Sequence, residues 1–340
     1  MAEGLRFEPV ERSLNEPTFR LMSHEHLSTD VLVIGAGMAG LAAGADLQQA
    51  GRQVLVVDKG RGVGGRVATR RIADATFDHG AQFFTVRDDR FAALVEQWID
   101  EGVAREWFRG PGDVHPRYRG VPGNSSIARH LARDLDVRLE RRVMRVETSQ
   151  NGWTAVLEDG SSWSAGSVVL TPPVPQSLQL LDAGGFIMAP AHRRSLEDIR
   201  YEPCLAAMAV LDAPSQIPSP GYLRFDDGPV AWVADNNVKG TSTRPAITLH
   251  ADSDYSSSRW DDDRKEVGRD LLEEVAEHLG ADVTEYQVHG WRFSKPVTVF
   301  SDSCLMISHD PPLVMAGDAF AGPRVEGAVL SGLAAARALR

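Results

Sequence analysis

The sequence is poor in cysteine. It contains two, Cys204 and Cys304, which lie a hundred positions apart. That spacing fits neither a zinc-binding motif nor a CxxC redox pair, so we predict no metal site and interpret both residues as structural thiols. Scarce cysteine also suits a reducing compartment, and we therefore expect a cytoplasmic protein.

A hydrophobic run long enough to cross a membrane is also missing. The best candidate, residues 31–47, is shorter than the roughly 20 apolar residues that a spanning helix needs, and it contains Asp46 and four glycines. The first residues are acidic and lack the apolar core of a secretion signal. We expect no membrane association, and we expect residues 1–29 to form an N-terminal tail.

Positive charge is in deficit. The chain has 36 Lys and Arg against 47 Asp and Glu, which gives a net charge of −11. This balance argues against a general affinity for nucleic acid, although it leaves room for a local basic pocket. No internal repeat stands out, and 340 residues that are 43% hydrophobic can bury a sizeable core in two domains. We therefore expect a globular protein with small-molecule partners.

A glycine motif stands where an apolar strand meets a helix. The predicted strand 31–34 is followed by Gly35-Ala-Gly37-Met-Ala-Gly40, and a second apolar strand ends at Asp58. This spacing is typical of a dinucleotide-binding unit, in which a helix N-terminus binds a pyrophosphate and the acid binds ribose hydroxyls. Gly35 permits the turn, Gly37 lets a phosphate approach the backbone, and Gly40 lets the helix pack closely.

Two further segments have the character of nucleotide-binding loops. The loop 59–71 contains Gly64-Gly65-Arg66 and resembles the second nucleotide motif of flavoproteins, with a solvated basic loop as the alternative. Near the C-terminus a buried strand ends at Gly317-Asp318, and a small-residue helix begins near Val325. Asp318 is placed to bind a polyol, and the helix dipole would favour negative charge on a reduced flavin. The alternative is a helix-capping aspartate beside a packed terminal helix.

The remaining segments indicate a second domain. Residues 89–106 show helical spacing, and 175–289 contain mostly alternating strand patterns with one clear helix at 264–279. We expect an α/β fold, α+β overall, in which a Rossmann-type FAD-binding domain is joined to a largely antiparallel β-sheet substrate domain. The first comprises residues 30–85, 124–174 and 290–340, and the second comprises 86–123 and 175–289.

Together these motifs resemble the flavin amine-oxidase superfamily. The resemblance rests on the glycine motif at 35–40, Gly64-Gly65-Arg66, Asp78-His-Gly-Ala-Gln-Phe-Phe-Thr and Gly317-Asp318. It is closer to the renalase-type branch and covers most of the chain after residue 29. The segments that carry this closer likeness are Gly80-Ala81-Gln82, 123–127, Asp235-Asn236, His250, Trp291-Arg-Phe-Ser and Gly317-Asp-Ala-Phe. The implied architecture is that of amine oxidases and p-hydroxybenzoate hydroxylase.

The resemblance implies a non-covalent FAD and the residues that contact it. The pyrophosphate would be held by Gly35, Gly37, Ala39, Gly40 and Arg66, the adenosine ribose by Asp58 and Lys59, and the adenine by the backbone of Val143. Asp318 would meet the ribityl chain, Ala81 and Gln82 would touch the flavin, and the backbone of Val325 and Glu326 would approach its O2 edge. Met38, Gly65 and Gly317 complete the predicted cofactor contacts.

The activity that the resemblance implies is oxidation of dihydronicotinamide dinucleotides reduced at the wrong ring carbon, 2- or 6-dihydro-NAD(P). A hydride would pass to flavin N5 and electrons then to O2, giving NAD(P)+ and hydrogen peroxide. The implied catalytic residues are Asn236, His250 and Trp291, with Gln82. Orientation would dominate the rate, because loss of hydride makes the ring aromatic. His250 and Trp291 are alternatively a satisfied structural histidine and a cover for the core.

Two other functions stay open. A flavin oxidase of a small amine commonly has an aromatic residue just before the final helix, but residues 320–324 contain no Tyr or Trp, and no cysteine motif for covalent flavin is present. Lys295 would either hold a water beside the flavin, as in amine oxidases, or lie on the surface. A non-catalytic flavin sensor is the second alternative, because no signature catalytic acid or nucleophile is evident.

Overall fold

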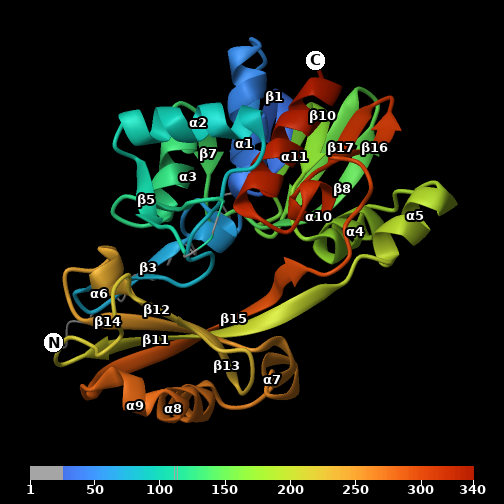
Figure 1. The fold of residues 1–340 in the computed structure, drawn as a ribbon. Coiled ribbons are helices and arrows are strands. Elements are labelled where there is room, and N and C mark those ends of the chain that lie inside the picture. The colour runs from blue at the N-terminus through green and yellow to red at the C-terminus, as the bar shows by residue number, and fades with distance from the viewer. Residues whose placement is uncertain (1–25, 111, 113) are drawn as a thin grey trace, which may run out of the picture.

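Two β-sheets organise the protein, which a computed structural model describes over residues 26–110, 112 and 114–340 (Figure 1). The larger sheet has eight strands. Its main path runs in the order β16 (Leu305–His309), β17 (Pro312–Met315), β10 (Ser162–Leu170), β1 (His26–Ile34), β2 (Val54–Val57) and β7 (Asp136–Arg138). Strands β8 (Val143–Ser149) and β9 (Gly152–Leu157) join it beside β10.

The centre of the larger sheet is parallel and buried on both faces. Strand β1 pairs in parallel with β10 and β2. Its residues alternate between the two faces: Val31 and Val33 pack with helices on one side, and Leu32 and Ile34 pack on the other. The first face is covered by α1 (Met38–Gln49), α2 (Asp89–Asp100), α3 (Ser125–Ala132) and α11 (Val325–Ala338). The second is covered by β8, β9, α4 (Val174–Ala183) and α5 (Pro190–Glu197).

The second sheet is antiparallel and has five strands. Their order is β12 (Tyr222–Arg224), β13 (Val230–Asp235), β14 (Ala246–Ala251), β11 (Tyr201–Leu211) and β15 (Val283–Pro296). Helices α7 (Ser253–Ser258), α8 (Arg264–Glu274) and α9 (Ala276–Leu279) cover its outer face (Figure 1). Val267 and Leu271 of α8 are fully buried there.

A small hairpin joins the two sheets. Strands β3 (Thr69–Ile72) and β4 (Ala75–Asp78) pair in antiparallel fashion just after the Gly-Gly-Arg loop. Ile72 and Phe77 pack with Met208 and Val210 of the second sheet in a separate hydrophobic cluster. The end of β4, at Asp78, is therefore held between the two halves of the molecule.

The structure confirms the predicted mixed α/β architecture and its strand–helix–strand unit. It differs in detail. The predicted helix 89–106 ends at Asp100, because Gly102 has a φ of +70° and the chain continues as β5 (Ala104–Phe108), paired with β6 (Arg117–Gly120). The segment 175–289 holds more helices than the one that was predicted, and two of the additional helices, α4 and α5, pack on the larger sheet.

The predicted domain limits remain a proposal, and two of them fall within strands. Strand β1 begins at His26, so residues 26–29 of the expected tail pair with β10. The limit at residue 290 divides β15, which belongs to the antiparallel sheet over its whole length. The other tail residues, 1–25, lie outside the described part of the chain. Among the described residues, no helix is long and apolar enough to cross a membrane.

Close contact between α1 and α11 depends on Gly332. A Cβ at this position would lie 2.1 Å from the backbone oxygen of Ala39. Alanine normally stabilises a helix interior by up to about 1 kcal/mol relative to glycine. We expect the opposite sign for Gly332→Ala, a loss of about 1–3 kcal/mol in the free energy of unfolding measured in urea, because the helices must move apart.

The control is Ala338→Gly, an exposed change in the last turn of the same helix, which should cost at most about 1 kcal/mol. A Gly332→Ala protein as stable as the wild type would contradict this account of the helix contact.

Candidate functional site

The glycine motif forms a tight turn between β1 and α1. Gly35 has a φ of +108°, and a Cβ at Gly40 would lie 1.9 Å from the Gly35 oxygen, which confirms the predicted close packing. Gly37 caps α1 without any side-chain hydrogen bond, and a Cβ there would meet nothing within 4 Å. The space beside Gly37 is therefore open at the N-terminus of α1, where a helix has N–H groups without intrahelical partners, and this arrangement suits a bound phosphate group.

Asp58 lies at the end of β2, beside this turn. Its carboxylate accepts hydrogen bonds from the backbone N–H of Ala36 at 2.7 Å and of Gly60 at 2.6 Å. The neighbouring Lys59 donates from Nζ to Gln176 Oε1 at 3.3 Å, and burial together with Arg142 lowers its pKa. Val143 begins β8.

The second and third nucleotide motifs converge on the first. Gly37 and Gly64 form an isolated bridge, and the Gly64 N–H donates to Ala36 O at 2.8 Å. Arg66, in the short 3-10 turn η1 (Gly65–Val67), donates from both terminal nitrogens to Asp318 at 2.6 and 2.7 Å. The structure thus brings together motifs that are separated by as many as 252 positions in the sequence.

The C-terminal motif is fixed from two directions. Gly317 precedes the short helix α10 (Asp318–Ala321), and its N–H donates to Ser331 Oγ at 2.8 Å. Glu326, at the start of α11, is buried, and its Oε1 accepts from the N–H groups of Arg87 and Asp88 at 2.6 and 2.9 Å. The Glu326 side chain therefore connects the start of α11 to the start of α2. The backbone of Glu326 and that of Val325 remain for the predicted flavin contact.

The turn at residues 78–82 collects the predicted substrate-side residues. Gln82 is buried; its Nε2 donates to Gly80 O at 3.1 Å and lies 3.5 Å from His250 Nε2. Trp291 donates from Nε1 to His79 O at 2.9 Å. Ala81 donates its N–H to Arg66 O at 2.8 Å, which connects this turn to the Gly-Gly-Arg loop.

Two of the predicted substrate-side residues, His250 and Asn236, are strongly affected by burial. Burial sets the ionisation state of His250. Together with the positive charge of Lys239, it lowers the pKa of His250 to about 4, so this imidazole is neutral near pH 7. Asn236 is fully buried, and its amide is already engaged by the protein. Its Oδ1 accepts from the Asp78 N–H at 3.3 Å, and its Nδ2 donates to Thr248 Oγ1 at 2.9 Å.

A buried ion pair lies beneath the turn, and the sequence did not reveal it. Lys239 Nζ is 2.8 Å from Asp78 Oδ2, both side chains are fully buried, and Nζ also donates to Gln82 Oε1 at 3.3 Å. The other Asp78 oxygen accepts from Thr69 Oγ1 at 2.6 Å and from the Asn124 N–H at 2.9 Å. Lys239 comes from the single-turn helix α6 (Asn236–Lys239), whose sequence carries no mark of burial.

Removing Lys239 should be strongly destabilising. Lys239→Met leaves the Asp78 carboxylate buried without its countercharge, and we expect a loss of about 3–5 kcal/mol in the free energy of unfolding measured in urea at pH 7. Lys295→Met is the control, because Lys295 is exposed and pairs with Glu202 at 3.3 Å; it should change stability by less than about 1 kcal/mol.

The double variant Asp78→Asn/Lys239→Met removes both charges and should recover part of the loss. Equal stability of Lys239→Met and the wild-type protein would show that this pair does not carry the energy assigned to it.

Comparison with known proteins identifies the family. The model for flavin containing amine oxidoreductase matches residues 98–340, and a model for an NAD(P)-binding Rossmann-like domain matches residues 33–98. Renalase from Mus musculus is 23% identical, and the alignment covers 91% of this chain and 98% of that protein. A putative flavin-containing monoamine oxidase, AofH, from Mycobacterium tuberculosis is 38% identical over 78 residues, which is 23% of this chain and 17% of that protein.

Solved structures agree on the fold. Putrescine oxidase, in its wild-type form bound to putrescine, superimposes with a TM-score of 0.69 at 16% identity, covering 92% of this chain and 99% of that one. A putative protoporphyrinogen oxidase from Exiguobacterium gives a TM-score of 0.65 at 12% identity. With a family model matched over most of its length and a turn open to a phosphate group, this chain belongs to the flavin-containing amine oxidoreductases and is an oxidoreductase that binds FAD.

Proposed function

We propose that this enzyme oxidises misreduced dihydronicotinamide dinucleotides, 2- or 6-dihydro-NAD(P), and passes the electrons to O2 to give NAD(P)+ and hydrogen peroxide. The observation that carries the proposal is the extent of the similarity to renalase, which covers 91% of the chain and so includes both sheets. The similarity to AofH extends over 78 residues, fewer than the antiparallel sheet alone spans from β11 to β15, so it cannot include both sheets.

The same proposal assigns the cofactor contacts. Arg66 and the turn at 35–40 would hold the FAD pyrophosphate, Asp58 and Lys59 the adenosine ribose, and Asp318 the ribityl chain. The open space at Gly37 and the proximity of Gly64 to Gly37 support this assignment. When bound, FAD supplies the hydride acceptor.

The substrate-side residues suit a reaction that needs orientation more than acid–base chemistry. Neutral His250, beside Gln82, has one hydrogen-bond donor and one acceptor and adds no charge, which is compatible with a carboxamide ligand. No base is needed to activate a dihydropyridine, whose loss of hydride makes the ring aromatic. Trp291 and Gln82 would therefore hold the ring in position, while Asn236 positions the 78–82 turn through its bond to Asp78.

Oxidation of a small amine is the second candidate, and the fold shared with putrescine oxidase favours it. Two features weigh against it. The aromatic residue of the segment 320–324, before the final helix, is Phe320, and it is buried and packs against Phe300 with ring centres 5.6 Å apart. Lys295, the candidate for a flavin-site lysine, is 60% exposed and pairs with Glu202.

Anaerobic mixing separates these functions. FAD-loaded protein would be mixed with 2-dihydro-NAD(P), 6-dihydro-NAD(P), ordinary NADH and a panel of amines, and the band of oxidised flavin followed over time. We expect rapid bleaching by one or both isomers, no comparable bleaching by amines, and hydrogen peroxide once air is admitted. Bleaching by amines alone would replace this proposal with amine oxidation, and no bleaching by any compound would favour a flavin sensor.

Two glycine variants test the proposed cofactor site. Gly37→Ala places a methyl group in the open space at the start of α1, so we expect a folded protein with FAD affinity lowered at least tenfold, because the phosphate can no longer approach the backbone. Affinity would be measured by titrating FAD into apoprotein and following flavin fluorescence.

Gly40→Ala is the comparison, since its Cβ would collide with the Gly35 oxygen, and we expect it to lower the melting temperature as well. Unchanged FAD affinity in a folded Gly37→Ala protein would exclude this turn as the phosphate site.

A further inference from the structure

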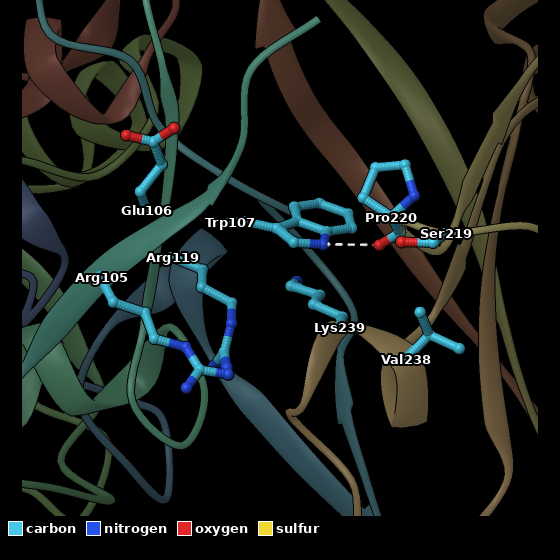
Figure 2. A pocket seen from close by; sticks show the side chains of 8 residues that line it. All are labelled: Arg105, Glu106, Trp107, Arg119, Ser219, Pro220, Val238 and Lys239. Atoms are coloured by element: carbon cyan, nitrogen blue, oxygen red, sulfur yellow. Dashed lines mark hydrogen bonds between the residues drawn. The ribbon is translucent and has the colours of Figure 1, made fainter.

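A basic pocket lies between the β5–β6 hairpin and α6 (Figure 2). Its volume is about 310 Å³, and three of the side chains that line it are cations, Arg105, Arg119 and Lys239. Glu106 is the acidic residue at its edge, and Figure 2 shows its carboxylate turned away from both guanidinium groups. In a chain with a net charge of −11, this is a concentrated positive site.

Arg119 carries a buried charge that the protein leaves without a carboxylate partner among the described residues. Its side chain is 1% exposed, and its Nη1 donates to Gly120 O at 2.9 Å and to Pro122 O at 3.2 Å, while Nε has no hydrogen-bond partner. Burial and the nearby Arg105 lower its pKa to about 10, although the charge of Asp78, which is itself paired with Lys239, acts in the opposite direction. Buried charges in proteins are ordinarily paired, so an unpaired guanidinium in a pocket points to a bound anion.

Arg105 places a second guanidinium beside the first. A Cβ at Gly240 would lie 2.8 Å from Nη2 of Arg105 and 2.8 Å from Nη2 of Arg119, so both groups meet over the Gly240 backbone. Figure 2 shows the two guanidinium groups next to each other. Gly240 ends α6 with a φ of +80°, and the missing side chain leaves room for them. Two like charges held together repel, and an anion that accepts hydrogen bonds from both forks would offset this repulsion.

Lys239 connects the pocket to the candidate substrate site. Its charge is balanced by Asp78, and Nζ lies 4.9 Å from the centre of the Trp107 ring and 3.3 Å from Gln82 Oε1. Trp107 is itself fixed by a hydrogen bond from Nε1 to Pro220 O at 2.8 Å (Figure 2). One wall of the pocket therefore touches the residue that is proposed to contact the flavin and the nicotinamide.

We propose that the Arg105–Arg119 pocket binds the phosphate oxygens of an anionic ligand. Resting on the proposed function, we assign this group to the diphosphate of the dihydronicotinamide dinucleotide. The pocket would anchor the charged part of the substrate while its ring lies beside Gln82 and His250. The arginine forks match phosphate oxygens, and the site is separate from the glycine turn assigned to the FAD pyrophosphate.

Anion binding is tested on the FAD-loaded protein, in which the phosphate site of the cofactor is already filled. Inorganic pyrophosphate and ADP-ribose would each be titrated by calorimetry into the wild type, Arg105→Gln and Arg269→Gln. Arg105 is exposed, so its replacement should leave the fold intact, and an unchanged melting temperature checks this. Arg269→Gln removes one exposed charge from α8, on the outer face of the second sheet.

We expect both probes to bind the wild type and Arg269→Gln alike, and Arg105→Gln to weaken both at least tenfold, because a charge-assisted hydrogen bond is lost. Wild-type affinity in Arg105→Gln, or no binding of either probe to the wild type, would overturn the anion site. Binding of pyrophosphate without ADP-ribose would indicate a site for a free anion and overturn the assignment to a dinucleotide.

Kinetics separate this proposal from the proposed function. For the dinucleotide isomers, Arg105→Gln should raise KM at least tenfold with little change in kcat, whereas oxidation of an isomer of 1-methyl-dihydronicotinamide, which lacks phosphate, should be unaffected. If no dihydronicotinamide is oxidised but ADP-ribose binding still depends on Arg105, the proposed function fails and the anion site stands. Oxidation with an unchanged KM in Arg105→Gln would overturn the substrate role of the pocket and leave the proposed function standing.

Discussion

The buried ion pair between Asp78 and Lys239 is the interaction on which the candidate site depends. Asp78 ends the hairpin that joins the two sheets, and Lys239 comes from α6, at the end of the antiparallel strand β13. Neither charge is stable in the interior alone, so the two segments must come together for either residue to be buried. Hydrogen bonds of Asp78 with Thr69 and Asn124 extend the same constraint to β3 and to the start of α3.

The ion pair fixes the turn that follows it, and that turn connects the cofactor side to the substrate side. Gln82 accepts from Lys239, and Ala81 donates to the backbone of Arg66, which in turn pairs with Asp318. One continuous set of hydrogen bonds therefore runs from α6 to the C-terminal nucleotide motif. A change in the position of the turn would therefore alter both the proposed flavin contacts and the proposed substrate contacts.

The sequence predicted what is local and missed what is brought together by folding. The turn at Gly35–Gly40 is specified within a few residues, because strand, glycine spacing and helix follow one another directly. The end of α2 at Asp100 depends on a positive φ at Gly102 that helical spacing does not reveal. Lys239 and Arg119 are buried only because segments distant in the sequence close over them, and a lysine or arginine in isolation predicts a surface position. Family resemblance selected Asn236 as a candidate catalytic residue, but it did not show that the Asn236 amide forms hydrogen bonds with Asp78 and Thr248.

Charge is distributed differently in the two parts of the proposed site, the 78–82 turn, where the ring would react, and the Arg105–Arg119 pocket, where the diphosphate would bind. Next to the 78–82 turn the charges are balanced: Lys239 is paired, His250 is neutral, and Arg66 is matched by Asp318. Hydride transfer from a dihydropyridine gains little from a strong nearby charge and depends on orientation. Unbalanced charge lies in the adjoining pocket, at Arg105 and Arg119. Binding of the remote diphosphate in the Arg105–Arg119 pocket would supply the energy that holds the dinucleotide on the protein. The groups at the flavin would then have to set only the orientation of the nicotinamide ring.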